Sequence, residues 1–149
     1  MKTLVYYVEG SKEEILSFLS DELQKAGYVK EGYKESLIKR EQEHPTGLGL
    51  PNSINVAIPH TETDLANENV FVIAIPKNEV KFKKIDDENK EISVDLIFLF
   101  VIKDPNTYLK FLARLTENFS DFEFTEYIKE KDLNKILTFL NENVLSEVD

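Results

Sequence analysis

Residues 94–102 read Val-Asp-Leu-Ile-Phe-Leu-Phe-Val-Ile, and this stretch decides the fold class. Every side chain from Leu96 to Ile102 is apolar. An unbroken apolar run of this length, with no alternation of polar residues, predicts a strand that is buried on both faces. Such strands lie in sheets that helices cover from both sides. We therefore expect an α/β protein, a single domain over residues 1–149, with a mixed β-sheet flanked by helices on both faces.

Three more strands are predicted upstream of this run. Ser53–Ile58 alternates in the manner of a half-buried strand, and Pro59 ends it. Val70–Ile75 is continuously apolar, whereas Val80–Ile85 alternates like an edge strand that faces solvent. Because functional sites often lie where strands end, the residue after Pro59 is a candidate.

Two stretches are expected to lack regular structure, and four helices are predicted. Pro45–Asn52 holds two prolines and two glycines, and Asp86–Lys90 is typical of a hairpin loop. In the second helix Glu41 is expected on the solvent-facing side, away from the apolar residues Tyr33 and Leu37. Apolar residues at helical spacing and capping residues place the helices over residues 12–26, 33–43, 105–119 and 133–144.

The composition excludes several classes of function. The chain has 18 Lys and Arg against 28 Asp and Glu, a formal net charge of −10, which argues against binding to nucleic acids or anionic membranes. With no cysteine and only two histidines, thiol nucleophiles and most metal sites are excluded, and no nucleotide-binding loop or serine-hydrolase motif occurs. The apolar run is too short to span a bilayer, and the amino terminus lacks a signal-peptide core. We expect a cytoplasmic protein that needs no metal or cofactor.

His60 is the residue whose local sequence best argues for reactivity. It directly follows a predicted strand and a proline, so the backbone holds it with little freedom to lose. With an unperturbed pKa of about 6.5, imidazole is mostly neutral at pH 7 and can act as a nucleophile or a base. A histidine at the end of a strand can equally be a structural or surface residue, and position alone leaves both interpretations open.

A family resemblance appears between Arg40 and His60. Three short segments in this region, at matching spacing, resemble the signature of the enzyme IIA components of the bacterial sugar phosphotransferase system, of the fructose and mannitol type. The predicted apolar strand and the helices on either side of this region extend the resemblance over nearly the whole chain. The three segments are Arg40-Glu41, Pro45-Thr46-Gly47 and Ala57-Ile58-Pro59-His60.

The resemblance implies that the chain is a phosphocarrier. In this family the matching histidine accepts a phosphoryl group from the carrier protein HPr and passes it to a cysteine of enzyme IIB, so His60 takes that role here. Neutral imidazole suits the role because it is both a nucleophile and a leaving group. Arg40 matches the family's arginine and is expected to clamp the phosphoryl oxygens, with Thr46 and backbone N–H groups near Gly47 as supporting donors. From the residues alone, Arg40 could instead be a helix-surface charge paired with Glu43.

One position departs from the fructose and mannitol pattern. Those members usually carry a second histidine at the start of the helix after the apolar strand, where this chain has Tyr108. A tyrosine can donate a hydrogen bond to the phosphoryl group, and simple helix packing is the other interpretation. Together with the Pro-Thr-Gly-x-Gly-x-Pro loop, this departure is more similar to the galactitol-type branch, which makes a polyol such as galactitol the expected substrate.

Further expectations concern partners and an alternative function. HPr and enzyme IIB must dock in turn around His60, and Leu48 and Leu50 are either contacts for them or part of the core. His44 is expected to be an exposed residue at a helix end. The alternative function is regulation, because similar domains of the nitrogen-related branch control a protein target through phosphorylation of the same histidine.

Overall fold

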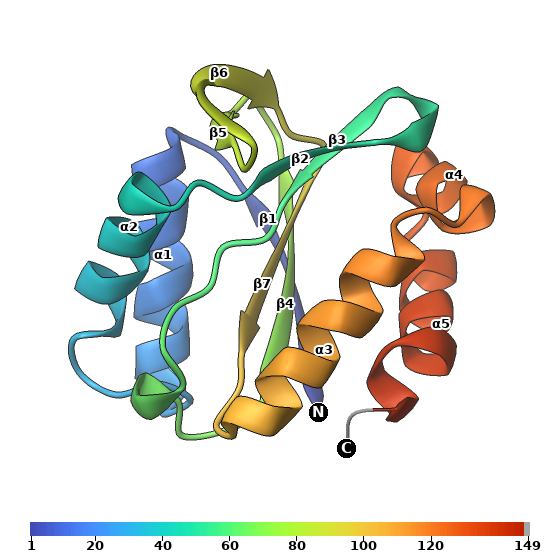
Figure 1. Cartoon of the computed structure of the whole chain (residues 1–149). Helices are drawn as coiled ribbons and strands as arrows, with labels where there is room; N and C mark the ends of the chain where they lie inside the picture. The colour runs from blue at the N-terminus through green and yellow to red at the C-terminus, as the bar shows by residue number, and fades with distance from the viewer. Residues whose placement is uncertain (148–149) are drawn as a thin grey trace.

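The computed structural model describes residues 1–147, and its centre is a mixed β-sheet (Figure 1). Across the sheet the strands lie in the order β1-β4-β7-β3-β2-β5-β6, and parallel pairs alternate with antiparallel pairs. In chain order the strands are β1 (Lys2–Val8), β2 (Gly47–Leu50), β3 (Ile54–Ala57), β4 (Val70–Pro76), β5 (Lys81–Lys84), β6 (Asp87–Ser93) and β7 (Leu96–Val101).

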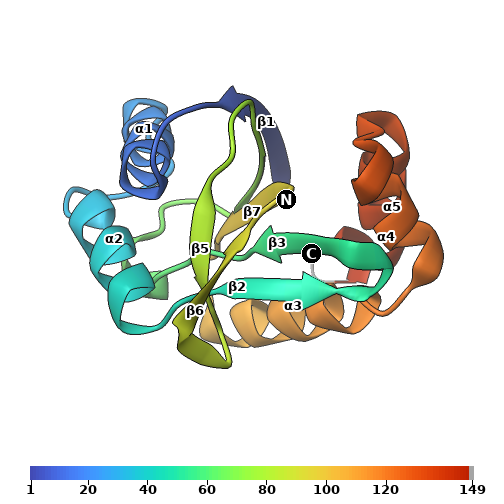
Figure 2. The ribbon, with the colours of Figure 1, turned by 90° about the horizontal axis from the view of Figure 1, so that it is seen from above.

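Helices cover both faces of the sheet, which confirms the expected α/β fold (Figures 1 and 2). One layer holds α1 (Lys12–Lys25) and α2 (Tyr33–Glu43). The other holds α3 (Pro105–Asn118), α4 (Phe122–Glu130) and α5 (Leu133–Asn143). Short 3-10 turns are η1 (Pro51–Ser53), η2 (Thr63–Leu65) and η3 (Leu145–Glu147). Within residues 1–147, no helix combines the length and apolar character needed to cross a membrane.

Strand β7 joins the two layers of the core, as its sequence predicts. All of its side chains are buried. Phe98 and Phe100 pack with residues of α3, α4 and α5, whereas Ile97 and Leu99 pack with residues of α1 and α2. Burying each of these side chains contributes roughly 1.5–3 kcal/mol, so a polar substitution on either face of β7 would disrupt the core.

Side-chain caps confirm the predicted starts of α1, α3 and α5. The Ser11 hydroxyl accepts a hydrogen bond from the backbone N–H of Glu14 at 3.1 Å, and the Glu14 carboxylate accepts one from the N–H of Ser11 at 2.9 Å. Asp104 and Asp132 cap α3 and α5. Asp121 caps α4 in the same way, although the sequence analysis predicts no helix there.

Three strands, β1, β2 and β6, lie where the sequence analysis predicts none. Strand β2 falls in the stretch expected to be irregular, and it pairs with β3 along its whole length. It also pairs with β5 at Gly47, where a Cβ would lie 2.6 Å from the carbonyl oxygen of Lys83, so glycine lets β5 approach closely. Strand β6 contains most of the predicted hairpin loop, and its polar side chains suit the outer edge of the sheet. The edge position predicted for β5 is wrong, because β5 lies between β2 and β6.

The β2–β3 hairpin is anchored to α4. At its turn Asn52 and Ser53 have positive φ angles of 71° and 58°. The Asn52 amide donates to Oε2 of Glu126 at 2.5 Å and accepts from Nζ of Lys129 at 3.3 Å. These contacts hold the end of the hairpin that leads into β3, and therefore into His60.

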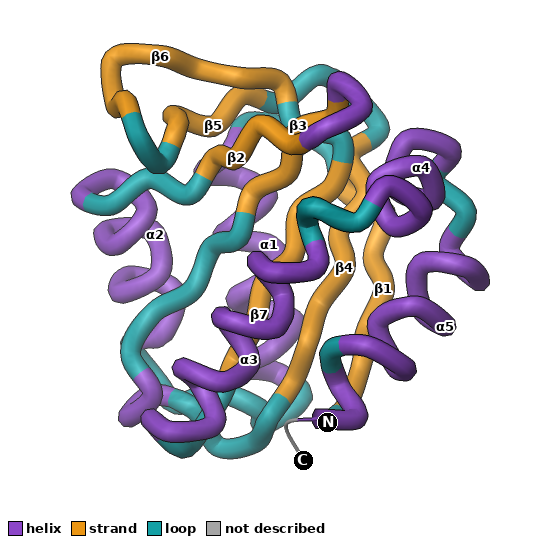
Figure 3. The backbone as a smooth tube through the Cα atoms, turned by 45° about the vertical axis from the view of Figure 1, so that its right-hand side comes forward, coloured by secondary structure: helices purple, strands orange, loops and turns teal. Residues whose placement is uncertain are grey.

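The pairing of β3 with β7 determines where the residues after β3 lie. The two strands are parallel, with Ala57 opposite Ile97. Three residues further along each chain, His60 and Phe100 stack on each other. The segment that follows β3 runs between α2 and α3 (Figures 1 and 3). Because parallel strands end at the same edge of a sheet, the start of α3, which follows β7, meets this segment.

Candidate functional site

The imidazole of His60 lies between two aromatic rings. It stacks on Phe100 with ring centroids 4.7 Å apart and an interplanar angle of 18°. Tyr108, from the start of α3, meets it edge-on with centroids 5.6 Å apart. Phe100 is itself 2% exposed, so the imidazole rests on the rigid core and keeps part of its own surface open.

One hydrogen bond indicates which ring nitrogen of His60 carries the hydrogen. Nδ1 lies 2.7 Å from the backbone oxygen of Ile58. A carbonyl oxygen can only accept, so the neutral ring carries its hydrogen on Nδ1 and its lone pair on Nε2. Nε2, on the other side of the ring, is therefore the nitrogen whose lone pair is available to a reaction partner.

The surroundings of His60 keep its ring neutral. Burial lowers the pKa of His60 below its usual 6.5, because the apolar surroundings disfavour the imidazolium. The bond to the Ile58 carbonyl raises this pKa, the positive charge of Arg40 lowers it, and the carboxylate of Glu62 raises it, but burial has the largest effect. At pH 7 the neutral form of the ring therefore predominates, and this is the form that can act as a nucleophile.

Arg40, in the last turn of α2, lies beside this ring. It lines a pocket of about 350 Å³ together with His60, and a second pocket of about 380 Å³ together with Tyr108 and Glu62. Its Nη1 donates to Oε1 of Glu62 at 3.2 Å, so its ion partner is Glu62 and not Glu43. The guanidinium thus lies where the two pockets meet.

Apolar side chains form much of the pocket that His60 and Arg40 share. Leu48, Ile85 and Leu112 line it. Ile85 is 51% exposed, and in the neighbouring pocket Leu109 is 63% exposed. Leu48 lines this pocket and also packs against the core, whereas Leu50 packs against the core.

Thr46 and Gly47 do not act as the free donors that the sequence analysis expects. Thr46 lines the pocket, but its N–H and its hydroxyl both donate to the carboxylate of Glu41, at 2.8 and 2.7 Å. Gly47 lies within the sheet between Ala57 of β3 and Lys84 of β5 and does not line the pocket. Their positions indicate a structural role.

The position of Glu41 contradicts the sequence analysis, which expects this side chain to face solvent. Glu41 is 3% exposed and lies on the buried stripe of α2 that begins with Tyr33 and Leu37. Burial raises its pKa to about 7, because the interior disfavours the charged form more than the two bonds from Thr46 favour it. The i, i+4, i+8 spacing of Tyr33, Leu37 and Glu41 is the sequence signal that could have located it.

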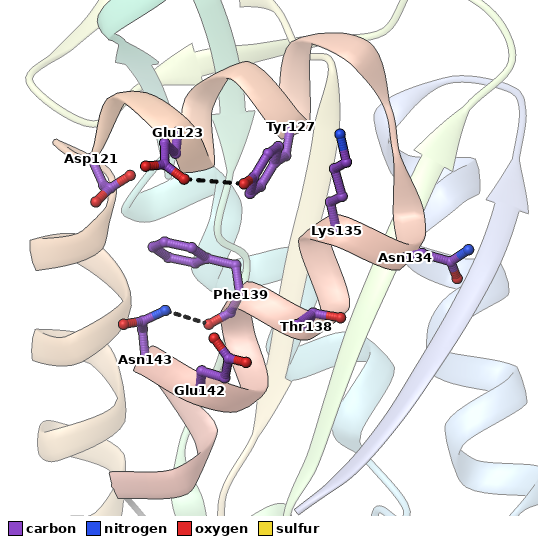
Figure 4. Close-up of a pocket in the computed structure, with 9 residues that line it drawn as sticks. All are labelled: Asp121, Glu123, Tyr127, Asn134, Lys135, Thr138, Phe139, Glu142 and Asn143. Carbon is purple, nitrogen blue, oxygen red and sulfur yellow. Dashed lines mark hydrogen bonds between the residues drawn. The ribbon is translucent and has the colours of Figure 1, made fainter.

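A separate pocket of about 390 Å³ lies between α4 and α5 (Figure 4). Some of its side chains contact one another: the Tyr127 hydroxyl donates to Glu123 at 3.1 Å, and Nζ of Lys135 lies 5.5 Å from the centre of the Tyr127 ring. None of its lining residues is a histidine or an arginine, and it shares no residue with the His60 site. His60 and Arg40 line a different pocket, the one described above.

Sequence comparison identifies the family to which this chain belongs. The family described as "Phosphoenolpyruvate-dependent sugar phosphotransferase system, EIIA 2" matches residues 2–143. The chain belongs to this EIIA family. One relative, the galactitol-specific EIIA component of the phosphotransferase system of Escherichia coli (strain K12), is 33% identical over 104 residues, which make up 70% of this chain and 68% of that protein. The chain is therefore a component of the sugar phosphotransferase system.

Solved structures share the EIIA fold. One is the complex of mannitol enzyme IIA with phosphorylated mannitol enzyme IIB from Escherichia coli, with a TM-score of 0.60, 22% identity, and 83% coverage of each chain. Another is the nitrogen regulatory protein IIA-Ntr from Neisseria meningitidis, with a TM-score of 0.61, 24% identity, and coverage of 84% of this chain and 83% of that one. At these identities the likeness establishes the fold.

In this EIIA chain the sequence analysis names some residues that the structure brings together and overlooks others. His60, Arg40 and Tyr108 meet at the ends of β3, α2 and α3. Phe100 and Glu62 are missed, because their contacts depend on strand pairing and on the path of the segment after β3. His44 is exposed, as expected; it follows α2, and its N–H donates to the carbonyl of Arg40 at 2.7 Å.

Proposed function

We propose that residues 1–149 form a single phosphocarrier domain in which His60 accepts a phosphoryl group from HPr and passes it to a cysteine of enzyme IIB. The observation that carries the proposal is the bond from Nδ1 of His60 to the Ile58 carbonyl, which leaves Nε2 unprotonated in a ring that shares a pocket with Arg40. Membership of the EIIA family supports the same role.

The first transfer follows from this geometry. The Nε2 lone pair attacks the phosphorus of phospho-HPr, the Nε2–P bond forms, and the P–N bond to the histidine of HPr breaks, which returns the electron pair to that imidazole. Positive charge develops on the His60 ring, and the Ile58 carbonyl stabilises it through the Nδ1 hydrogen. Arg40 can leave Glu62 to bind the phosphoryl oxygens, because ion pairs between exposed side chains are weak.

The second transfer reverses these changes. A thiolate of enzyme IIB attacks the phosphorus, the Nε2–P bond breaks, and His60 leaves as neutral imidazole with its hydrogen still on Nδ1. Tyr108 is close enough to the ring to contribute a hydroxyl donor to the phosphoryl group. The exposed side chains of Ile85 and Leu109 would contribute apolar contacts for the two partners.

Labelling with phosphoenolpyruvate tests the carrier role. The chain incubated with labelled phosphoenolpyruvate, enzyme I and HPr should gain one phosphoryl group in an acid-labile, alkali-stable bond. His60→Ala should abolish the label, and His44→Ala, which removes the other histidine, should retain it. Equal labelling of wild type and His60→Ala would refute the proposal.

For the transported substrate we propose a polyol of the galactitol type. A galactitol-specific EIIA relative and the position of Tyr108 support this choice. The likeness to the nitrogen regulatory protein is one of fold and gives regulation no specific support. The phosphorylated chain should transfer faster to a galactitol-type enzyme IIB than to a mannitol-type one, in a rapid-quench assay with each purified IIB. Equal or faster transfer to the mannitol-type partner would contradict the galactitol assignment.

A further inference from the structure

We propose that Glu41 is a positioning residue for His60, acting through Thr46 and the backbone of Ile58. The inference rests on the proposed function, because it explains how Nε2 of His60, the proposed acceptor of the phosphoryl group, is kept free of hydrogen. Glu41 makes no contact with the imidazole itself, so it acts through other groups.

The first link joins Glu41 to Thr46. Each carboxylate oxygen of Glu41 accepts one hydrogen bond from Thr46: Oε2 from the backbone N–H at 2.8 Å, and Oε1 from the hydroxyl at 2.7 Å. Both residues are buried, with Glu41 3% and Thr46 4% exposed. Two hydrogen bonds to one carboxylate fix both the backbone and the rotamer of Thr46. The start of β2 is thereby tied to the end of α2.

The second link joins Thr46 to Ile58. The N–H of Ile58 donates to both the backbone oxygen and the hydroxyl oxygen of Thr46, each at 3.3 Å. Because the Thr46 hydroxyl gives its hydrogen to Glu41, its lone pairs are turned toward Ile58. Glu41 therefore orients the hydroxyl oxygen of Thr46, which accepts a hydrogen bond from the N–H of Ile58.

The third link joins Ile58 to His60. The carbonyl of Ile58 accepts from Nδ1 of His60 at 2.7 Å, and Pro59 between them has a restricted φ angle. The N–H of Ile58 is thus fixed by Thr46, and its carbonyl selects the Nδ1–H form of the imidazole. If the first two links loosen, we expect the carbonyl to lose its fixed direction and the ring to populate the other tautomer, with its hydrogen on Nε2.

The charges around Glu41 do not explain its burial as a salt bridge. Lys12 of α1 is the charged group whose field favours the ionised carboxylate. Arg40, the next residue in the chain, pairs with Glu62. A buried carboxylate whose hydrogen bonds both come from one threonine is better explained by the position it gives to that threonine than by stabilisation of the fold.

Two substitutions and two matched controls test the proposal. Glu41→Gln keeps the size of the side chain but replaces one accepting oxygen with an N–H₂ donor, and Thr46→Val keeps the shape but removes the hydroxyl. Glu43→Gln makes the same change of charge at an exposed position of the same helix, and Thr46→Ser restores the hydroxyl. Amide spectra and melting temperatures identify the variants that remain folded.

The decisive measurement is the tautomer of His60, read from the ¹⁵N shifts of its ring at pH 7.5 without any partner. Glu41→Gln and Thr46→Val should each populate the form with its hydrogen on Nε2, while both controls stay on the Nδ1–H form. In the transfer assay, both substitutions should lower the rate at saturating phospho-HPr by roughly tenfold, with the half-saturating concentration of HPr changed less than twofold. The double variant should be no slower than either single variant, because the two residues act in one chain of contacts.

Several outcomes would overturn the positioning role. One is a Glu41→Gln protein that is folded, less stable, and unchanged in both tautomer and saturating rate. Another is a Thr46→Ser protein as slow as Thr46→Val. If the wild type takes no label from phospho-HPr, the proposed function fails, whereas the tautomer measurement still decides whether Glu41 positions the ring.

Discussion

Arg40 and Glu62 form an ion pair beside His60, with Nη1 of the arginine 3.2 Å from Oε1 of the glutamate. The side chains are 37% and 67% exposed, so solvent screens the pair and it stabilises the fold little. A phosphoryl group on His60 would offer Arg40 three charged oxygens in place of one carboxylate. The pair therefore keeps the guanidinium near the ring and leaves it able to change partners.

Substituting Arg40 should slow phosphoryl transfer without unfolding the protein. Removing a donor aimed at developing charge typically costs about 10²-fold in rate, so Arg40→Ala should lose about that much. Arg40→Lys keeps the charge but not the planar pair of donors and should recover only part of the loss. Quenched-flow transfer from phospho-HPr measures the rates, with Lys39→Ala as an exposed neighbouring control. A wild-type rate in Arg40→Ala would show that the clamp is not needed.

The same two residues should shift the pKa of His60 in opposite directions. Arg40 lowers that pKa and Glu62 raises it, while burial, the largest influence, keeps it below 6.5. Arg40→Ala should therefore raise the pKa of His60, and Glu62→Gln should lower it. NMR titration of the ring protons gives both values, and phosphorylation of the wild type should persist to a pH below 6.5 before protonation of the ring stops it. Shifts of the same sign in both variants would mean that the two side chains do not act on the ring as a pair of opposite charges.

How far the sequence predicts the structure depends on how local each feature is. The apolar run of β7 and the capping residues Ser11 and Asp132 are local signals, and they predict the layers correctly. Strand β2 is missed because its pairing with β3 and with β5, where Gly47 lets the distant Lys83 approach, is not visible in a local stretch rich in proline and glycine.

At the candidate site, too, residues with a local sequence signal are predicted and long-range contacts are missed. His60 and Arg40 lie in a local motif, so the sequence predicts them. Phe100 reaches His60 only through the parallel register of β3 and β7, which no local pattern shows. Glu41 has a local signal in its helical spacing, but the usual preference of glutamate for solvent leads to the opposite expectation.

Burial of Glu41 should make the stability of the protein depend on pH. Its pKa is about 7 in the folded protein, against an ordinary value of 4.5. Between these values the folded state holds a proton that the unfolded state has lost, so the free energy of unfolding falls as pH rises and becomes constant above pH 7. The contribution amounts to about 3 kcal/mol.

Urea unfolding of wild type and Glu41→Gln at pH 4.5, 6.0 and 7.5 isolates this contribution. The free energy of unfolding of the wild type, less that of the variant, should decrease across this range by up to about 3 kcal/mol. Glu43→Gln, which changes an exposed carboxylate two residues away, should differ from wild type by a nearly constant amount. A difference for Glu41→Gln that is also constant would mean that Glu41 ionises normally.

Gly47→Ala should destabilise the protein by about 2–3 kcal/mol, because the added methyl group would overlap the backbone of a neighbouring strand. Its Cβ would lie 2.6 Å from the carbonyl oxygen of Lys83, an atom that cannot move without separating β2 from β5. Gly49→Ala is the matched control on the same strand, since its Cβ would lie 3.4 Å from the nearest atom, the flexible Asn55 amide oxygen. Chemical unfolding of both variants measures the difference. If Gly47→Ala were as stable as Gly49→Ala, the close approach of β5 would not require a glycine at position 47.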